Sequence, residues 1–316
     1  MKKLLLLLTL FTFGTQTIFA QKKKDKSFAA EENALLWKIE GKKMEDSYLY
    51  GTIHMIDSKD FFLTPSTEKY FKECERVTFE INMEDMTDMG AQMSLLMSAF
   101  MEGGATLKTL LSAEDYKVVE DHFAEIGLPL MLLERIKPMF LSVLASEDMG
   151  SMMGGMTGEE TAEDKDASSI KSYEMEFMEM AKSQEKEMAG LETMEFQMSM
   201  FDSIPYKAQA EMLVETIQAS GEEGSDQLDE MVEMYKAQDL KAMEKMIAEG
   251  DEGLGEFAEL LLNNRNRNWI PIMEKQMKEK ATFFAVGAGH LGGEVGVVAL
   301  LREAGYKVTA VDPVKP

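Results

Sequence analysis

Two short segments of the sequence place a histidine three residues after a glycine. The first pairs Gly51 with His54 in SYLYGTIHMID, and the second pairs Gly287 with His290 in FFAVGAGHLGG. Each follows a run of aromatic and aliphatic residues that is typical of a buried strand. The chain has 3 histidines in all, so two of them stand in the same local setting. A histidine on such a loop can bind a metal ion, transfer a proton or make a structural hydrogen bond.

Together with a carboxylate, the two histidines predict a divalent metal site. The expected strand RVTFEIN carries Glu80 near its end. His54 and His290 likewise stand at the ends of expected strands. Imidazole and carboxylate are usual ligands of catalytic zinc and related metals, which keep an open position for water. The metal lowers the pKa of that water and polarises a carbonyl group. The alternative is that each histidine bonds its own loop. The spacing alone favours this alternative, because Gly-x-x-His is short and common.

A third interpretation concerns the glycines of the second segment. Residues 287–292, GAGHLG, match the dinucleotide fingerprint G-x-G-x-x-G between an expected strand and an expected helix. Asp312 lies about where a ribose-binding acid would stand. This interpretation leaves the twin segment at 51–54 unexplained, and dinucleotide cofactors are scarce outside the cytoplasm. We therefore rank it below the metal hypothesis.

One basic, amide-rich segment stands out in an acidic chain. In RNRNW, Arg265 and Asn266 begin a run of alternating arginine and asparagine that ends at Trp269. Such groups can hold an oxyanion or a substrate carboxylate. A solvated helix face anchored by the tryptophan is the simpler interpretation, and the spacing alone favours it.

The ends of the chain predict an α/β (α+β) fold, and the middle predicts helices. Strand patterns occur at 34–41, 47–54, 76–82, 281–289 and 306–312, with helices at 64–75 and 293–305. We expect a central β-sheet built from the N- and C-terminal segments, with a large all-α insertion at about 84–278. A helix from 111 to 127 has a capping-box-like start at Ser112. Parallel β-α-β units would place both histidine loops at carboxyl ends of strands, where open α/β sheets bind ligands.

The first 20 residues predict a secretory signal peptide, with Lys2 and Lys3 before an apolar run and Ala20 as the cleavage position. A membrane anchor is the alternative, but the apolar run is short and broken. Residues 21–32 read as a disordered lead-in, and residues 33–316 as one domain. We expect an exported protein, periplasmic or secreted, with no integral membrane span once the signal is removed.

Charge restricts the partners. The chain has 33 Lys and Arg against 57 Asp and Glu, a formal net charge of −24, which repels nucleic acid and anionic lipid. We therefore expect a peptide or small-molecule substrate and no nucleic acid. Cys74 is the single cysteine and has no partner for an internal disulfide. The hydrolase motifs H-E-x-x-H and G-x-S-x-G are absent from the sequence.

The 29 methionines are unusual, and several recur at helical spacing. We expect such stripes to form adaptable core, with a peptide groove as the next interpretation and copper(I) ligation as the last. The two stripes are Met83, Met86, Met89, Met93, Met97 and Met101, and Met175, Met178, Met194 and Met198.

The motifs together resemble the TraB/GumN family, which includes the Tiki-type proteases and is related to the erythromycin esterase and ChaN-like group. The resemblance is carried by YLYGTIH, VTFEIN, GLET at 190–193, RNRNW and FFAVGAGHLGGEVGVVALLREAGYKV. These segments stand in the family's order and cover nearly all of the chain after the signal. The closing segment is the most specific of them.

The resemblance implies an active centre made by both Gly-x-x-His motifs and the glutamate of the strand. Tiki-type members are metal-dependent proteases, associated with manganese or cobalt more than with zinc. By position, His54, His290 and Glu80 are the implied metal ligands. Glu80 is ligand or general base, and Arg265 and Asn266 match the Arg-Asn of a late helix and join it as catalytic residues.

The chain departs from the family pattern in its Met- and Glu-rich middle and at two further places. Pro271 is expected to interrupt the late helix, and SIKSYEMEF lacks an expected glycine-aspartate. Two hypotheses follow from the whole analysis. The first is a metal-dependent hydrolase of the bacterial cell envelope, in the first place a peptidase. The second is a non-catalytic periplasmic protein that binds a peptide or another ligand in the same cleft.

Overall fold

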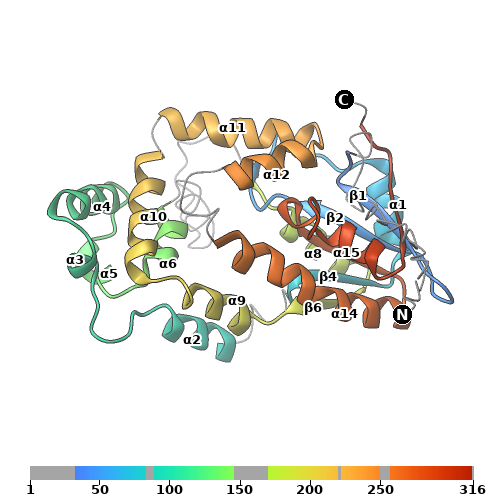
Figure 1. Ribbon diagram of the computed structural model, residues 1–316, viewed down its shortest axis with the longest axis horizontal. Helices are drawn as coiled ribbons and strands as arrows, with labels where there is room; N and C mark the ends of the chain where they lie inside the picture. The colour runs from blue at the N-terminus through green and yellow to red at the C-terminus, as the bar shows by residue number, and fades with distance from the viewer. Residues whose placement is uncertain (1–32, 83–88, 146–169, 220–221, 250–256, 315–316) are drawn as a thin grey trace, which may run out of the picture.

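The computed structural model describes residues 33–82, 89–145, 170–219, 222–249 and 257–314 (Figure 1). The expected signal peptide at 1–20 and lead-in at 21–32 lie outside the described residues. In the part that is described, no helix combines the length and the apolar character needed to cross a membrane.

The core of the fold is a six-stranded mixed sheet in the order β6-β4-β7-β2-β1-β8. Strands β6, β4, β7 and β2 are parallel neighbours, and β1 is antiparallel to both β2 and β8. The expected α/β fold with a sheet from both ends of the chain is confirmed. The strands are β1 (Leu36–Glu40), β2 (Ser47–Thr52), β4 (Arg76–Ile81), β6 (Glu187–Glu192), β7 (Thr282–Gly287) and β8 (Lys307–Ala310). Two short strands, β3 (Ile56–Asp57) and β5 (Ile170–Lys171), pair separately.

Both histidine segments leave the sheet at the same edge. Strands β2 and β7 are adjacent and parallel, with Thr52 opposite Gly287, so the chain continues from both strands at neighbouring points. From β2 it crosses through α1 (Pro65–Glu73) to β4, on the far side of β7. From β7 it crosses through α15 (Val297–Glu303) to β8, beyond β2 and β1. The predicted pair of strand-loop-helix-strand units is therefore present.

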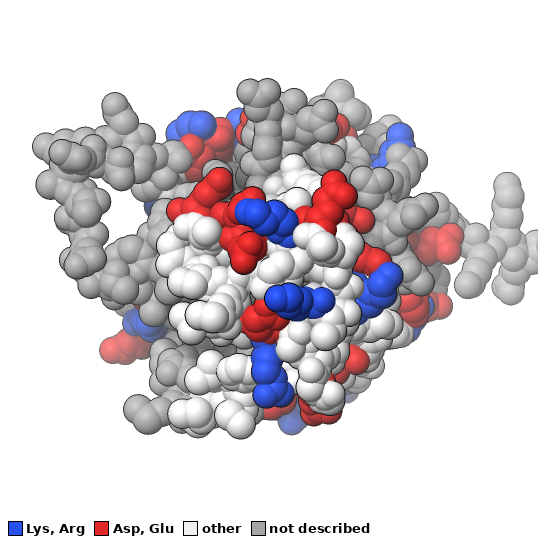
Figure 2. Space-filling view, turned by 90° about the vertical axis from the view of Figure 1, so that its left-hand side faces the viewer, with Lys and Arg blue, Asp and Glu red and all other residues white. Residues whose placement is uncertain are grey.

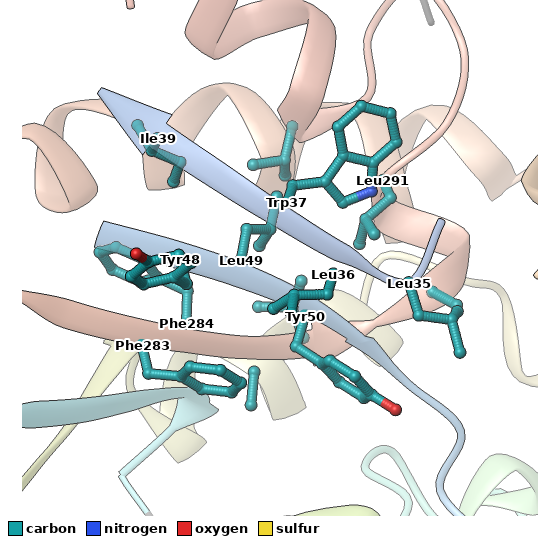
Figure 3. Packing of buried hydrophobic residues seen from close by; sticks show 14 of the residues in the cluster. Leu35, Leu36, Trp37, Ile39, Tyr48, Leu49, Tyr50, Phe283, Phe284 and Leu291 are labelled. Atoms are coloured by element: carbon teal, nitrogen blue, oxygen red, sulfur yellow. The ribbon is translucent and has the colours of Figure 1, made fainter. Parts of the chain in front are cut away.

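Alternating large side chains give the sheet two buried faces (Figure 3). Tyr50 and Phe283 lie on one side of the strands, and Trp37 and Leu291 lie on the other. On the first side, Phe71 of α1 packs 5.1 Å from the Phe283 ring. Helix α8 (Tyr173–Ser183) adds further aromatic contacts on that side. Each such side chain contributes about 1.5–3 kcal/mol by leaving water, which holds β2 and β7 together under the site.

Local signals in the sequence start the helices where expected. Thr64 accepts a hydrogen bond from the Thr67 backbone N–H and precedes Pro65 in the first turn of α1. Ser112 does the same for the Asp115 N–H at the start of α4, as the capping pattern predicted.

Helices α3, α4, α5, α6 and α10 of the middle region form a lobe with its own core, at the end of the molecule away from the sheet (Figure 1). Side chains of α4, α6 and α10 meet there, among them Val119, Leu141 and Leu213. Figure 2 views this end, where acidic and basic side chains lie beside one another among uncharged ones. The helices between β4 and β7 are α2 (Met89–Ser98), α3 (Leu107–Leu110), α4 (Ala113–Glu125), α5 (Leu130–Leu133), α6 (Pro138–Ala145), α8, α9 (Met194–Phe201), α10 (Tyr206–Ala219), α11 (Glu222–Lys236), α12 (Leu240–Glu249), the π-helical turn η2 (Glu259–Asn263) and α14 (Asn264–Glu279).

The structure differs from the expected all-α insertion at 84–278, because two strands, β5 and β6, lie inside that range. Strand β6, inside that range, pairs with β4 and forms an edge of the central sheet. Its sequence EMAGLE is only partly buried and lacks a clear alternation, so its pattern does not indicate a strand. The methionine stripes also differ from the expected core, because Met93 and Met97 are exposed while Met101 and Met178 are buried.

Replacing Gly190 of β6 by alanine is expected to destabilise the protein. The added Cβ would lie 2.5 Å from the Asn82 backbone nitrogen, so β6 and β4 would have to separate. Overpacking of this kind costs about 1–3 kcal/mol, and calorimetry should show a melting temperature lower by several degrees. Lys72→Ala, on the exposed face of α1, is the control. An unchanged melting temperature for Gly190→Ala would contradict the described pairing of β6.

Candidate active site

Glu80, Arg265 and His290 lie together at the carboxyl ends of β4 and β7. Glu80 belongs to β4, and His290 ends the short 3-10 turn η3 (Ala288–His290) that follows β7. Glu80 Oε1 accepts a hydrogen bond from the Gly287 backbone N–H at 2.9 Å and lies 3.6 Å from His290 Nε2. Glu80 Oε2 is paired with the Arg265 guanidinium. These three predicted site residues are thus in one cluster.

The Arg265 guanidinium is held by two carboxylates. Besides Glu80 it bonds Glu192 of β6, at 3.0 Å from Nε and 2.6 Å from Nη2 to the same oxygen. The other Glu192 oxygen accepts from Trp269 Nε1 at 2.9 Å. Arg265 is only 7% exposed, so these carboxylates, and not water, must compensate its positive charge. The solvated helix face is therefore wrong for Arg265, while Trp269 is buried as an anchor would be. Glu192 is a site residue that the sequence analysis missed.

Asn266 determines which nitrogen of His290 carries the proton. Its Nδ2 donates to the backbone carbonyls of Val295 at 2.9 Å and His290 at 3.4 Å. Its Oδ1 therefore faces His290 Nδ1, at 2.6 Å. An amide oxygen only accepts, so Nδ1 carries the hydrogen and Nε2 has the lone pair. That lone pair accepts from Arg265 Nη1 at 3.1 Å.

Helix α14 carries both Arg265 and Asn266 into the site. The π-helical turn η2 leads directly into it, and the helix then runs unbroken to Glu279. The expectation that Pro271 interrupts this helix is wrong, since the proline lies inside it. Trp269, one turn after Arg265, lies with its ring 4.9 Å from the guanidinium and 4.4 Å from the His290 ring.

His54 lies at the same edge of the sheet in a different environment. Its side chain is 75% exposed, and Nδ1 is bonded to Glu174 Oε1 at 3.0 Å. Thr52 Oγ1 donates to the same oxygen at 2.7 Å, and Ser172 Oγ donates to the other at 3.0 Å. A carboxylate behind a histidine fixes the ring and leaves Nε2 as the outward nitrogen. Sequence reasoning missed Glu174, although it stands in SIKSYEMEF, the segment in which a glycine-aspartate pair was expected.

The surroundings give the two histidines opposite protonation states. Burial lowers the pKa of His290 to about 4, so its ring is neutral at pH 7. The hydrogen bond to Glu174 raises the pKa of His54 to about 9, so this ring is protonated. Burial by itself would raise the pKa of Glu80, but His290, Arg265 and the Gly287 N–H lower it to about 2. At neutral pH the site therefore contains an ionised Glu80, a neutral His290 and a protonated His54.

The donor atoms suit a divalent metal in their chemistry, but they are not assembled into a ligand set. His290 has a lone pair on Nε2 and Glu80 is an ionised carboxylate, whereas His54 would have to release the proton on its outward Nε2 before it could bind a metal. Across the residues that the structure describes, no three His, Cys, Asp or Glu side chains are grouped so that they could hold a metal ion. The Arg265 guanidinium bonds both Glu80 and His290 Nε2, so a metal there would have to displace it.

The dinucleotide interpretation does not agree with the local geometry. After β7 the glycine-rich segment forms the 3-10 turn η3, and α15 begins only at Val297. No long helix therefore starts at the glycines to receive a pyrophosphate. Asp312 is bonded to Ser66 of α1. Gly51 is explained by packing instead, because a Cβ there would lie 3.0 Å from Leu291 and 3.1 Å from Ala288.

The sequence model of the TraB/PrgY/gumN family matches residues 35–310. The chain belongs to this family. The match begins beside β1 and ends with β8, so it takes in the whole sheet and the cluster around Arg265.

Curated relatives are named as metalloproteases. Metalloprotease TIKI1 of Danio rerio is 23% identical over 314 residues, which cover 87% of this chain and 63% of the relative. Metalloprotease TIKI1 of Homo sapiens is 23% identical over 318 residues, covering 88% and 62%. Metalloprotease TIKI2 of Xenopus tropicalis is 21% identical over 317 residues, covering 87% and 59%. The chain thus spans about three fifths of the length of these relatives. No solved structure matches the chain.

The two site histidines are expected to titrate on opposite sides of pH 6.5. Nitrogen NMR of the imidazoles should show His290 neutral with hydrogen on Nδ1 down to about pH 5, and His54 doubly protonated up to about pH 8. The chain has 3 histidines, so single His→Gln variants assign every signal. A His290 ring that gains its proton above pH 6.5 would contradict the described burial and tautomer.

Glu174→Gln is expected to return the pKa of His54 towards 6.5. Because the folded-state pKa of His54 is raised, its stabilisation is fully present below pH 6.5 and is lost as pH rises through about 9. The difference in unfolding free energy between wild type and Glu174→Gln should therefore shrink between these values. Urea unfolding across pH measures it, with Glu176→Gln on the same helix as control. A difference that stays constant with pH would show that the pair does not form.

Proposed function

We propose that the protein is a metal-dependent peptidase of the bacterial cell envelope. One observation carries the proposal: two parallel strands deliver both Gly-x-x-His segments to one sheet edge, where His290 lies 3.6 Å from Glu80. Membership of the family and the metalloproteases among the relatives support the reaction class. Under this proposal His54, His290 and Glu80 are the metal ligands, and the metal is divalent (manganese, cobalt or zinc).

The residues of the chain would each have a defined task. Asn266 holds His290 with its lone pair on Nε2, and Glu174 orients His54. Both oxygens of Glu80 are held, one by Arg265 and one by the Gly287 N–H, which suits a ligand better than a mobile base. Arg265 would position Glu80 and offer Nη1 to the oxyanion once His290 Nε2 is engaged elsewhere. A bound metal would supply a water of lowered pKa and polarise the peptide carbonyl.

A non-catalytic binding protein of the same fold is the second candidate. The Arg265 guanidinium favours this candidate, because it bonds Glu80 and His290, and a metal would need both of these residues as ligands. In that case the cluster is a structural ion pair, and the neighbouring cleft binds a peptide or another ligand without turnover.

Elemental analysis of protein purified without chelator separates the two candidates. The metal-dependent peptidase should contain about one equivalent of metal, lost in His54→Ala/His290→Ala, because each ring supplies a ligand. Peptide hydrolysis should fall by about 10²–10⁴ in the double variant and in Glu80→Gln. His122→Ala is the matched control, since this third histidine lies on α4 in the helical lobe. Wild-type protein that takes up no metal on reconstitution and cleaves no peptide would contradict the peptidase.

A further inference from the structure

A pocket of about 290 Å³ lies beside the candidate site, between the two histidine segments and the helices α11 and α12. Residues 52–55 and 287–289 form one wall. The other wall is made by Met231 and Tyr235 of α11 and by Met243 and Met246 of α12. These four residues have no part in the cluster around Arg265.

The pocket wall is mainly apolar, because three of its polar groups are bonded elsewhere and His54 is the lining side chain with an outward nitrogen. The Tyr235 hydroxyl donates to the Gly51 carbonyl at 2.9 Å. Thr52 Oγ1 donates to Glu174, and the Gly287 N–H donates to Glu80. A cationic group that entered would lose its water without gaining a partner, whereas an anionic one could pair with His54. An apolar side chain that entered would gain the free energy of leaving water.

The volume and the side chains suit a single large residue. At 290 Å³ the pocket is just below the range of about 300–1,000 Å³ of small-molecule sites, and a whole helix, about 10 Å across, is too wide for it. Four of the lining residues are methionines, Met55, Met231, Met243 and Met246. Unbranched thioether side chains adapt to ligands of different shape, so the pocket accepts a class of side chains instead of one.

We propose that this pocket binds one leucine, methionine or phenylalanine side chain of a peptide, next to the bond that the site cleaves. The inference rests on the proposed peptidase only for the cleavage. The pocket lies next to the candidate site because the two share residues. His54 lines the pocket, and Gly287 both lines it and bonds Glu80. A side chain seated there holds its own backbone at the edge where Glu80 and His54 lie. Helices α11 and α12 then determine specificity, and the sheet edge supplies the reacting groups.

Host peptides of glycine and serine with one guest residue test the proposal. Binding is read by the fluorescence anisotropy of a terminal fluorescein, and cleavage by mass spectrometry. Guests leucine, methionine and phenylalanine should bind about tenfold or more tightly than alanine or lysine. Met246→Trp, which fills the pocket, should reduce all guests to the affinity of alanine. Met131→Trp, at an exposed position of α5 in the helical lobe, should leave the preference unchanged.

Each outcome decides one of the two proposals. Equal affinity for all guests, or a preference that survives both Met246→Trp and the second filling variant Met231→Trp, overturns the pocket. A preference for apolar guests that Met246→Trp abolishes, without cleavage of any peptide, supports the pocket and contradicts the peptidase. Cleavage without any guest preference contradicts the pocket alone. Circular dichroism and the melting temperature show which of the two filling variants is folded, and that variant is used.

Discussion

The buried charge of Arg265 is the constraint on which the site depends. A guanidinium that is 7% exposed must be compensated by protein groups, because an unpaired buried charge costs several kcal/mol. The compensation comes from Glu192 of β6 and Glu80 of β4, while His290 accepts a further hydrogen bond. With His290 neutral, two carboxylates face one guanidinium, so the cluster carries one excess negative charge. This excess favours a cation nearby, and the protonated His54 is one such group.

The two Gly-x-x-His segments show how position in the fold gives one motif two chemistries. Their backbones pack against each other, since Gly51 leaves no room for a Cβ beside Ala288. His290 then turns under α14, where burial and Asn266 keep it neutral with Nε2 as acceptor. His54 turns outward, where Glu174 holds it protonated. The repeat in the sequence suggests a symmetric pair of ligands, but the fold places the two histidines in different environments.

Local patterns in the sequence predicted those parts of the site that lie on or directly after strands with a clear strand pattern. The strands before His54 and His290 are rich in aromatic residues, and Glu80 falls on such a strand as well. Glu192 and Glu174 escaped because their partners are remote, 73 residues away for Arg265 and 120 residues away for His54. No local sequence pattern identifies a glutamate whose bonding partner lies so far away in the chain. The edge strand β6 likewise derives its structure from pairing with β4, and Pro271 shows tertiary packing overriding a local rule.

Under the proposed function, the architecture separates the groups that react from the groups that select. The ion-paired cluster joins β4, β6, η3 and α14, so a change in any of these elements disturbs a buried charge. Helices α11 and α12 only close the apolar wall, with Met231, Met243 and Met246 outside the polar contacts of the cluster. Substitutions there alter the volume of the pocket without leaving a charge unpaired. Under that function, changes in the helical wall would alter the ligand while the groups at the sheet edge stay the same.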